Sequence, residues 1–74
     1  MLDATSEGET QMRELTEREA QVVELVAAGR SNKQIARELG ISEPTVKPHV
    51  SSILLKLGCG NRAQAAVFWR ERAE

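Results

Sequence analysis

The spacing of glycines after residue 15 limits the fold of this chain more than any other feature. Three segments each open on Ser or Thr and end at a glycine, and a fourth opens on an asparagine. Such side chains cap the free amides of a helix start, and glycine ends a helix readily because it adopts the left-handed conformation. We therefore expect four short helices, which open at Thr16, Ser31, Ser42 and Asn61 and end near residues 28, 40, 58 and 72.

Two of these helix starts have the spacing of a capping box. Glu19 follows three residues after Thr16, and Gln34 follows three residues after Ser31, so each pair can satisfy two free amides reciprocally. Helices of this length joined by short turns leave no room for a β-sheet. The expected fold class is all-α, a compact four-helix bundle over residues 15–74.

Residues 1–14 differ in composition from the rest of the chain. They contain acidic and small polar residues and show no apolar periodicity. A segment of this kind buries too little apolar surface to fold. We expect it to be a disordered acidic linker or tail.

Residues 31–57 meet the requirements of a helix-turn-helix. In residues 43–57 five apolar side chains form one helical stripe, consisting of Val46, Val50, Ile53, Leu54 and Leu57. The three-residue connection before this segment forces a steep crossing of the two helices. Gly40 supplies the positive φ of the turn, and Ala36 is small where the helices approach. A miniature core is expected from Ile35, Leu39, Ile41 and Val46.

Five blocks of the chain resemble the LuxR-type helix-turn-helix domain, which is the output domain of NarL/FixJ response regulators and of quorum-sensing activators. The blocks are LTERE (15–19), GRSNKQIA (29–36), SEPTVKPHV (42–50), KLG (56–58) and NRAQA (61–65). The resemblance extends from residue 15 to about residue 70. It implies sequence-specific binding to double-stranded DNA by a bacterial-type transcriptional regulator, with residues 43–57 as the recognition helix in the major groove.

The resemblance also implies roles for individual residues. Positions that match Lys47, Pro48 and Ser51 reach base edges in the family, and positions that match Ser31, Asn32, Lys33 and Thr45 hold phosphates. Helix geometry agrees independently. With Val46 at zero and about 100° per residue, the apolar stripe centres near about 25°, whereas Lys47, Ser51, Pro48 and Ser52 fall at about 100°, 140°, 200° and 240°. We therefore add Ser52 to the expected DNA-binding residues.

Pro48 is unusual for a recognition helix. It lies six positions after Ser42, beyond the first turn in which proline is harmless, and it removes the amide that would bond to the Pro44 carbonyl. We expect a local bend or a loosened first turn, with a regular helix from about His49 onward. The proline ring can still touch a thymine methyl group.

The charge distribution leaves a second function open. The net charge is −1, although residues 25–74 hold eight basic and four acidic residues. The chain is acidic overall, and Ser51 and Ser52 offer no charge to a phosphate or a guanine. These features also suit a protein-binding helical adaptor or an anti-regulator that has lost its DNA contacts. A steep loss of DNA affinity with added salt distinguishes DNA binding from this alternative.

The fourth helical segment predicts a partner surface. Its apolar side chains point in nearly every direction, so burial on more than one side is expected. The resemblance implies a homodimer on DNA through this C-terminal helix, and we expect contacts from Ala63, Val67, Trp69 and Arg70. Dimerisation without DNA stays open, because one short helix buries far less than the roughly 1,200 Å² of a stable interface. RNA polymerase is a further candidate partner.

Enzymatic chemistry finds no support in the residues. The chain has one cysteine and one histidine, and no glycine-rich phosphate loop or paired nucleophile and base. We expect no enzymatic activity, no cofactor and no metal site. A single thiol, with neither a signal peptide nor an apolar run of membrane length, favours a cytoplasmic location.

Overall fold

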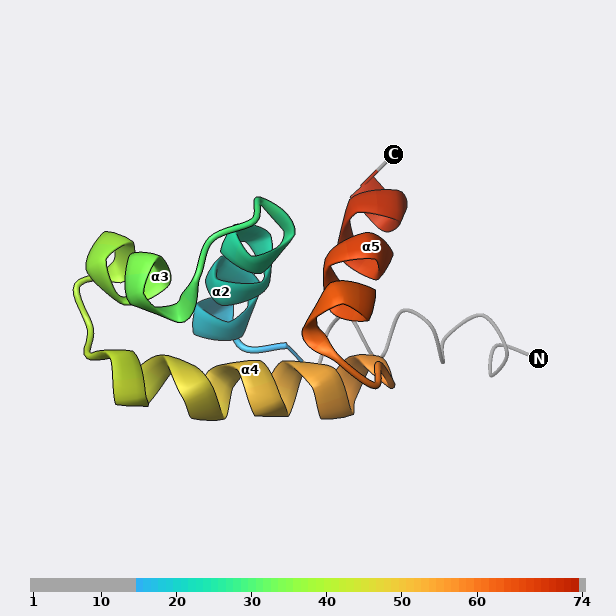
Figure 1. Cartoon of the computed structure of the whole chain (residues 1–74). Coiled ribbons are helices and arrows are strands. Elements are labelled where there is room, and N and C mark those ends of the chain that lie inside the picture. Colours follow the sequence, from blue (N-terminus) through green and yellow to red (C-terminus); the bar gives the residue numbers. More distant parts are fainter. Residues whose placement is uncertain (1–14, 74) are drawn as a thin grey trace.

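The computed structural model describes residues 15–73 and contains four α-helices in that range (Figure 1). They are α2 (Glu17–Ala27), α3 (Asn32–Leu39), α4 (Glu43–Leu57) and α5 (Arg62–Ala73). The described residues between them form turns and bends, without a strand. This confirms the all-α class and the expected helix boundaries. The expected linker at residues 1–14 lies outside the described residues.

Side chains begin three of the helices as the sequence predicts. The Thr16 hydroxyl accepts from the Glu19 amide, and the Glu19 carboxylate accepts from the Thr16 amide, both at 3.0 Å. Ser31 and Gln34 make the same reciprocal pair at 3.1 and 2.9 Å. At the start of α5, the Asn61 side-chain oxygen accepts from the Gln64 amide at 2.9 Å. Both capping boxes are confirmed.

The start of α4 differs from the expectation. Ser42 is the N-cap, but its side chain makes no capping hydrogen bond, and its hydroxyl instead pairs with the Thr45 hydroxyl at 2.6 Å. Pro44, at the second helical position, has no amide hydrogen to donate. The Thr45 amide donates to the Ser42 main-chain oxygen at 3.0 Å. The prediction of a side-chain cap was wrong because both candidate amides are absent or already used.

Pro48 does not loosen the first turn of α4. The helix is α-helical from Glu43 onward and continues through the proline, and Figure 1 shows it as an unbroken ribbon. The expected loosened turn is therefore not found. One main-chain hydrogen bond is lost at this point. Pro44 and Pro48 are both exposed, so water can reach the main chain beside them and solvate the Pro44 carbonyl.

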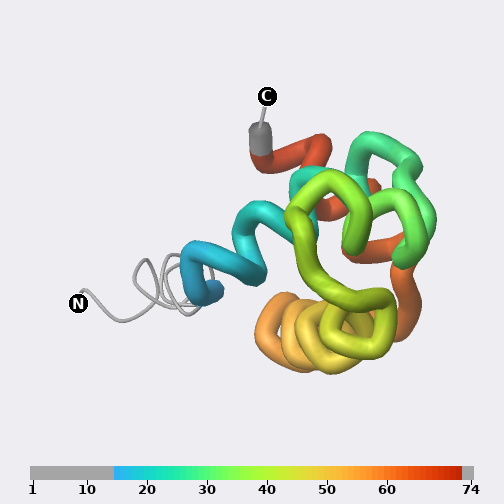
Figure 2. The backbone as a smooth tube through the Cα atoms, turned by 90° about the vertical axis from the view of Figure 1, so that its left-hand side faces the viewer, coloured from blue at the N-terminus to red at the C-terminus, as the bar shows by residue number. Residues whose placement is uncertain are grey.

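The core lies where α2, α3 and α4 meet. The largest fully buried side chains are Val22, Val23, Ile35, Val46 and Ile53. The expected miniature core is present, because Ile35 and Val46 are fully buried while Leu39 and Ile41 pack against the same cluster. Gly40 has a φ of 70° at the turn. In Figure 2, which looks roughly along α4, α2 and α3 lie across one side of that helix.

α5 stands near the C-terminal end of α4 and packs on α2 (Figure 1). Its Ala65 side chain is only 1% exposed, so this small residue is the point at which α5 enters the bundle. None of the four helices within residues 15–73 is long and apolar enough to cross a membrane. The bundle thus leaves one side of α4 uncovered by its other helices, and this arrangement positions the candidate site.

Candidate nucleic-acid interface

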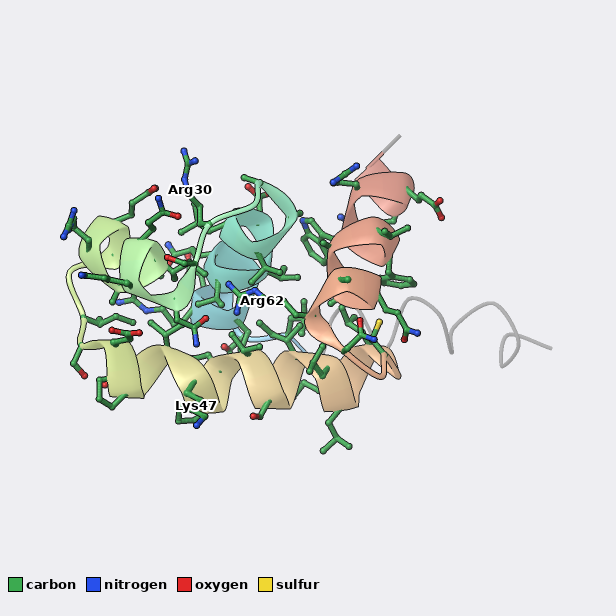
Figure 3. All side chains as sticks on the ribbon, viewed as in Figure 1. Arg30, Lys47 and Arg62 are labelled. Atoms are coloured by element: carbon green, nitrogen blue, oxygen red, sulfur yellow. The ribbon has the colours of Figure 1, made fainter. Side chains whose placement is uncertain are left out.

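α4 has one side in the core and one side open to solvent. Val46, Ile53 and Leu57 are buried, whereas Lys47, Pro48, Ser51 and Leu55 are exposed. We call these four exposed residues the open side of α4. Figure 3 shows Lys47 on the side of α4 turned away from α2 and α3. A helix presented in this way can enter a groove without disturbing the core.

Leu55 was not singled out by the sequence reasoning, yet it is 83% exposed. It lies about 180° around the helix from Val46, directly opposite the buried stripe. In the sequence, the exposure of Leu55 was indicated only by its absence from the apolar stripe. Its neighbours Ile53, Leu54 and Leu57 all belong to that stripe. An exposed leucine gives the open side an apolar contact point in addition to Pro48.

Ser52 lies at the edge of the open side. Its side chain is half-buried, and its hydroxyl hydrogen-bonds to the Glu19 carboxylate. The structure therefore directs this serine toward α2, unlike Ser51, which is exposed. Ser52 therefore links α4 to α2 and exposes only part of its side chain beside the open side of α4.

Glu19 fixes α2 to α4 through a nearly buried carboxylate. Only 6% of the residue is exposed, and the Lys56 ammonium lies 2.8 Å from its Oε1. Burial raises the pKa of Glu19, but hydrogen bonds from Lys56, the Thr16 amide and Ser52 outweigh it, and the pKa falls from 4.5 to about 2. The carboxylate is thus ionised at neutral pH. This ion pair holds the rear of α4 in place.

The expected phosphate-binding residues gather at the starts of α3 and α4. Ser31, Lys33 and Thr45 are exposed, and Asn32 is half-buried. The hydroxyls of Ser31 and Thr45 are already engaged in the helix starts. Lys33 is the only positively charged residue among these four, and its side chain is exposed to solvent.

A shallow hollow brings Asn32 and Lys47 together. It is lined by Asn32 from the start of α3 and by Glu43, Pro44 and Lys47 from α4. A residue expected at a phosphate and a residue expected at a base edge therefore border the same depression.

Arg62 connects α5 to this region and was not predicted as a site residue. Its Nη1 donates to the Asn32 side-chain oxygen, and its Nη2 donates to the Arg30 main-chain oxygen, both at 2.6 Å. Arg62 is half-buried, and in the view of Figure 3 it lies between Lys47 and Arg30. Arg30 itself pairs with Glu38 at 2.8 Å. In the sequence, Arg62 was marked only by its place in the NRAQA block.

The expected dimer residues divide between two faces of α5. Ala63, Val67 and Arg70 are exposed, and Val67 remains 48% exposed. Trp69 instead packs against the core, with the Arg72 guanidinium 4.2 Å from its ring centroid. The helix therefore has a buried face and an open one. A shallow groove on the open face is lined by residues that include Ala63, Val67 and Phe68.

The residues that the structure describes contain no candidate metal site. Within residues 15–73, no group of three or more His, Cys, Asp or Glu side chains is placed to hold a metal ion. The surface that stands out is the open side of α4 together with the hollow beside it.

Comparison with known proteins gives consistent matches. YhcZ of Bacillus subtilis, an uncharacterized transcriptional regulatory protein, is 54% identical over 55 residues, covering 74% of this chain and 26% of that protein. The Bacillus subtilis transcriptional regulatory protein LiaR is 48% identical over 54 residues, covering 73% and 26%. The nitrate/nitrite response regulator NarL of Escherichia coli is 45% identical over 60 residues, covering 81% and 28%.

The chain spans about a quarter of the length of these relatives, all of which are named as regulators and not as enzymes. Residues 13–69 match the family described as bacterial regulatory proteins, luxR family. This match covers most of the sequence, including the capping boxes, the helix-turn-helix and the start of α5. The chain therefore belongs to the luxR family of bacterial regulatory proteins.

Proposed function

We propose that this chain binds double-stranded DNA sequence-specifically, as the output domain of a transcriptional regulator, by inserting α4 into the major groove. The observation that carries the proposal is the two-sided character of α4. Val46 and Ile53 hold the helix in the core while Lys47, Pro48 and Ser51 stand open. The major groove is wide enough to admit an α-helix and presents a distinct pattern at each base pair.

The open side of α4 divides into polar and apolar contacts. Lys47 can donate to guanine O6 and N7, and Ser51 can donate or accept at a base edge. Pro48 and Leu55 can only make apolar contacts, for which the thymine methyl group is the natural partner in this groove. Ser52, bonded to Glu19, lies at the edge of this surface. We infer a preference for sites that combine guanine with thymine.

The phosphate contacts are assigned to the helix starts beside this surface. Lys33 supplies charge, and Ser31, Asn32 and Thr45 supply hydrogen-bonding groups. Such contacts fix the register of a protein on the duplex, whereas contacts to base edges specify the sequence. They also release counterions and make the affinity salt-dependent.

We further propose that two copies bind together through the open face of α5. Ala63, Val67 and Arg70 are exposed there, and two-fold pairing would place the two α4 helices on half-sites related by symmetry. Trp69 contributes to the proposed dimer only indirectly, because it packs against the core and so holds α5 in place. RNA polymerase remains a candidate partner for the assembled regulator.

A protein-binding adaptor is the second candidate function. A groove between α2 and α3 is lined by three carboxylates, Glu17, Glu24 and Glu38, and by the apolar Leu25 and Leu39. An acidic groove with an apolar floor suits a basic segment of another protein. This groove is distinct from the open side of α4, so the two functions make different predictions.

The test is selection of binding sites from a random duplex pool, followed by titration of the selected duplex and a scrambled one at two salt concentrations. The proposal predicts preference for the selected duplex and a steep loss of affinity as salt rises, because counterions are released. Absence of an enriched sequence, together with weak binding that does not respond to salt, would contradict DNA recognition and favour the adaptor.

A further inference from the structure

Arg62 makes the tightest polar link between separate helices of the DNA-facing region. It is the first residue of α5, yet its guanidinium bonds to the Asn32 side chain at the start of α3 and to the Arg30 main-chain oxygen before it. The planar fork of arginine holds two acceptors in a fixed relation, which an ammonium group cannot do. The start of α3 is thus clamped from α5.

This link determines which way the Asn32 amide faces. A guanidinium group only donates hydrogen bonds, so the atom of Asn32 that faces it must be the oxygen. The amide nitrogen, with its two N–H donors, therefore points to the other side. Within residues 15–73 the structure gives that nitrogen no hydrogen-bond partner.

The same side chain borders the hollow that also contains Lys47. Glu43 and Pro44 complete its lining, and Lys47 provides positive charge that offsets Glu43. A neutral amide donor beside a cation suits a phosphate oxygen, which accepts hydrogen bonds from both kinds of group. Without Arg62, the Asn32 amide could rotate and present its oxygen, which repels a phosphate, to the hollow.

We propose that Arg62 is a positioning residue for DNA binding: it orients the Asn32 amide so that its nitrogen donates to one phosphate beside Lys47. This inference rests on the proposed function, and it makes α5 part of the DNA-binding apparatus as well as a dimer surface. Arg62 itself acts through Asn32 and through the Arg30 carbonyl, without contact to DNA.

The experiment replaces single phosphates of the selected duplex by neutral methylphosphonates and measures the affinity of the full chain by fluorescence anisotropy. Wild-type protein should lose affinity by about tenfold at one phosphate position assigned to Asn32, as expected for a hydrogen bond to a charged group. Asn32→Asp keeps a side-chain oxygen that can accept from Arg62, so we expect it to fold, but it offers no donor. It should bind the unmodified duplex about tenfold more weakly and lose nothing further at that position.

Arg62→Met removes both hydrogen bonds of Arg62. In this variant, the methylphosphonate at the Asn32 position should cause a smaller loss of affinity than in the wild type, while the losses at the other positions stay the same. Arg62→Lys retains one donor and should restore part of the effect. Arg37→Met is the matched control, because it removes the same charge from an exposed position of α3. It should leave the pattern of sensitive phosphates unchanged. Thermal unfolding of each variant separates these effects from loss of the fold.

Two results would overturn the inference alone. One is specific binding by Asn32→Asp at wild-type affinity, and the other is an undiminished methylphosphonate effect in Arg62→Met. Failure of the wild-type protein to prefer any duplex would be a different result, because it would contradict the proposed function before any variant is compared.

Discussion

Lys47 is the only cation on the open side of α4, since Lys56, the other lysine of that helix, pairs with Glu19 at the rear. Its replacement therefore tests base recognition more directly than any other single change. Lys47→Ala should keep the helical circular dichroism spectrum and weaken specific binding by about 1–3 kcal/mol. The measurement is a titration of the selected duplex and of variants changed at each guanine.

Lys33→Ala provides the control for Lys47, because Lys33 is exposed at the start of α3, where phosphates are expected. It should weaken binding to all sequences alike and reduce the salt slope by about one. If Lys47→Ala binds with unchanged affinity and native circular dichroism, then its assignment to a base edge is wrong.

Glu19 gives a pH-dependent contribution to stability. Its pKa is lowered in the folded state to about 2 from 4.5, so the contribution is present above about pH 4.5 and disappears as the pH falls toward 2. Glu19→Gln should lower the free energy of unfolding at pH 7 by about 1–3 kcal/mol, because the variant loses the ion pair between Glu19 and Lys56. Thermal melts at pH 7 and pH 3 should show the difference between the two proteins shrinking in acid. An equal difference at both pH values would contradict the role of the ion pair.

Within α4, Pro48 is expected to lower helix stability and, under the proposed function, to contact a base. Pro48→Ala restores the amide that bonds to the Pro44 carbonyl, and a proline inside a helix costs on the order of 3 kcal/mol. Because both prolines are exposed, part of that cost is already offset by water, and we expect a gain of about 1–2 kcal/mol. Denaturant unfolding measures it.

The same variant should lose discrimination between thymine and deoxyuridine at one position of the selected duplex, since the smaller alanine no longer reaches the methyl group. A lower unfolding midpoint in Pro48→Ala would show that the proline is accommodated without cost. Unchanged discrimination would remove Pro48 from the base contacts.

Helix boundaries could be predicted from the sequence because they depend on local chemistry. Thr16 with Glu19, and Ser31 with Gln34, act across three residues, and Gly40 acts through its own φ. The side-chain cap predicted at Ser42 is absent because Pro44, two residues later, has no amide hydrogen and the Thr45 amide donates to the Ser42 main-chain oxygen. The distribution of apolar residues similarly predicted the buried stripe of α4.

The parts that could not be predicted depend on contacts distant in sequence. Arg62 reaches Asn32 across 30 residues, and Lys56 reaches Glu19 across 37 residues. No local spacing in the sequence indicates that the residues of either pair are in contact. Trp69 likewise packs against the core. Its burial could not be predicted, because the apolar residues of α5 point in nearly every direction and do not mark one buried face. Packing, not helix propensity, decides these positions.

For the whole molecule, the proposed dimer through the open face of α5 predicts that two copies bind one palindromic duplex. Val67→Glu places a charge on this face, where Val67 is 48% exposed, and should not disturb the core. We expect the variant to lose the two-to-one complex on a palindromic duplex, which sedimentation velocity measures. Gln21→Glu adds the same charge at an exposed position of α2 and is the control. A persistent two-to-one complex in Val67→Glu would contradict dimerisation through α5.

Methylation protection by dimethyl sulfate tests the proposed placement of α4 in the major groove. In a duplex this reagent modifies guanine N7 in the major groove and adenine N3 in the minor groove, so one reaction reports on both grooves. On the selected duplex, α4 should protect guanine N7 within each half-site and leave the neighbouring adenine N3 reactive, and Lys47→Ala should reduce the protection. Protected adenine N3 beside fully reactive guanine N7 would show that α4 does not lie in the major groove.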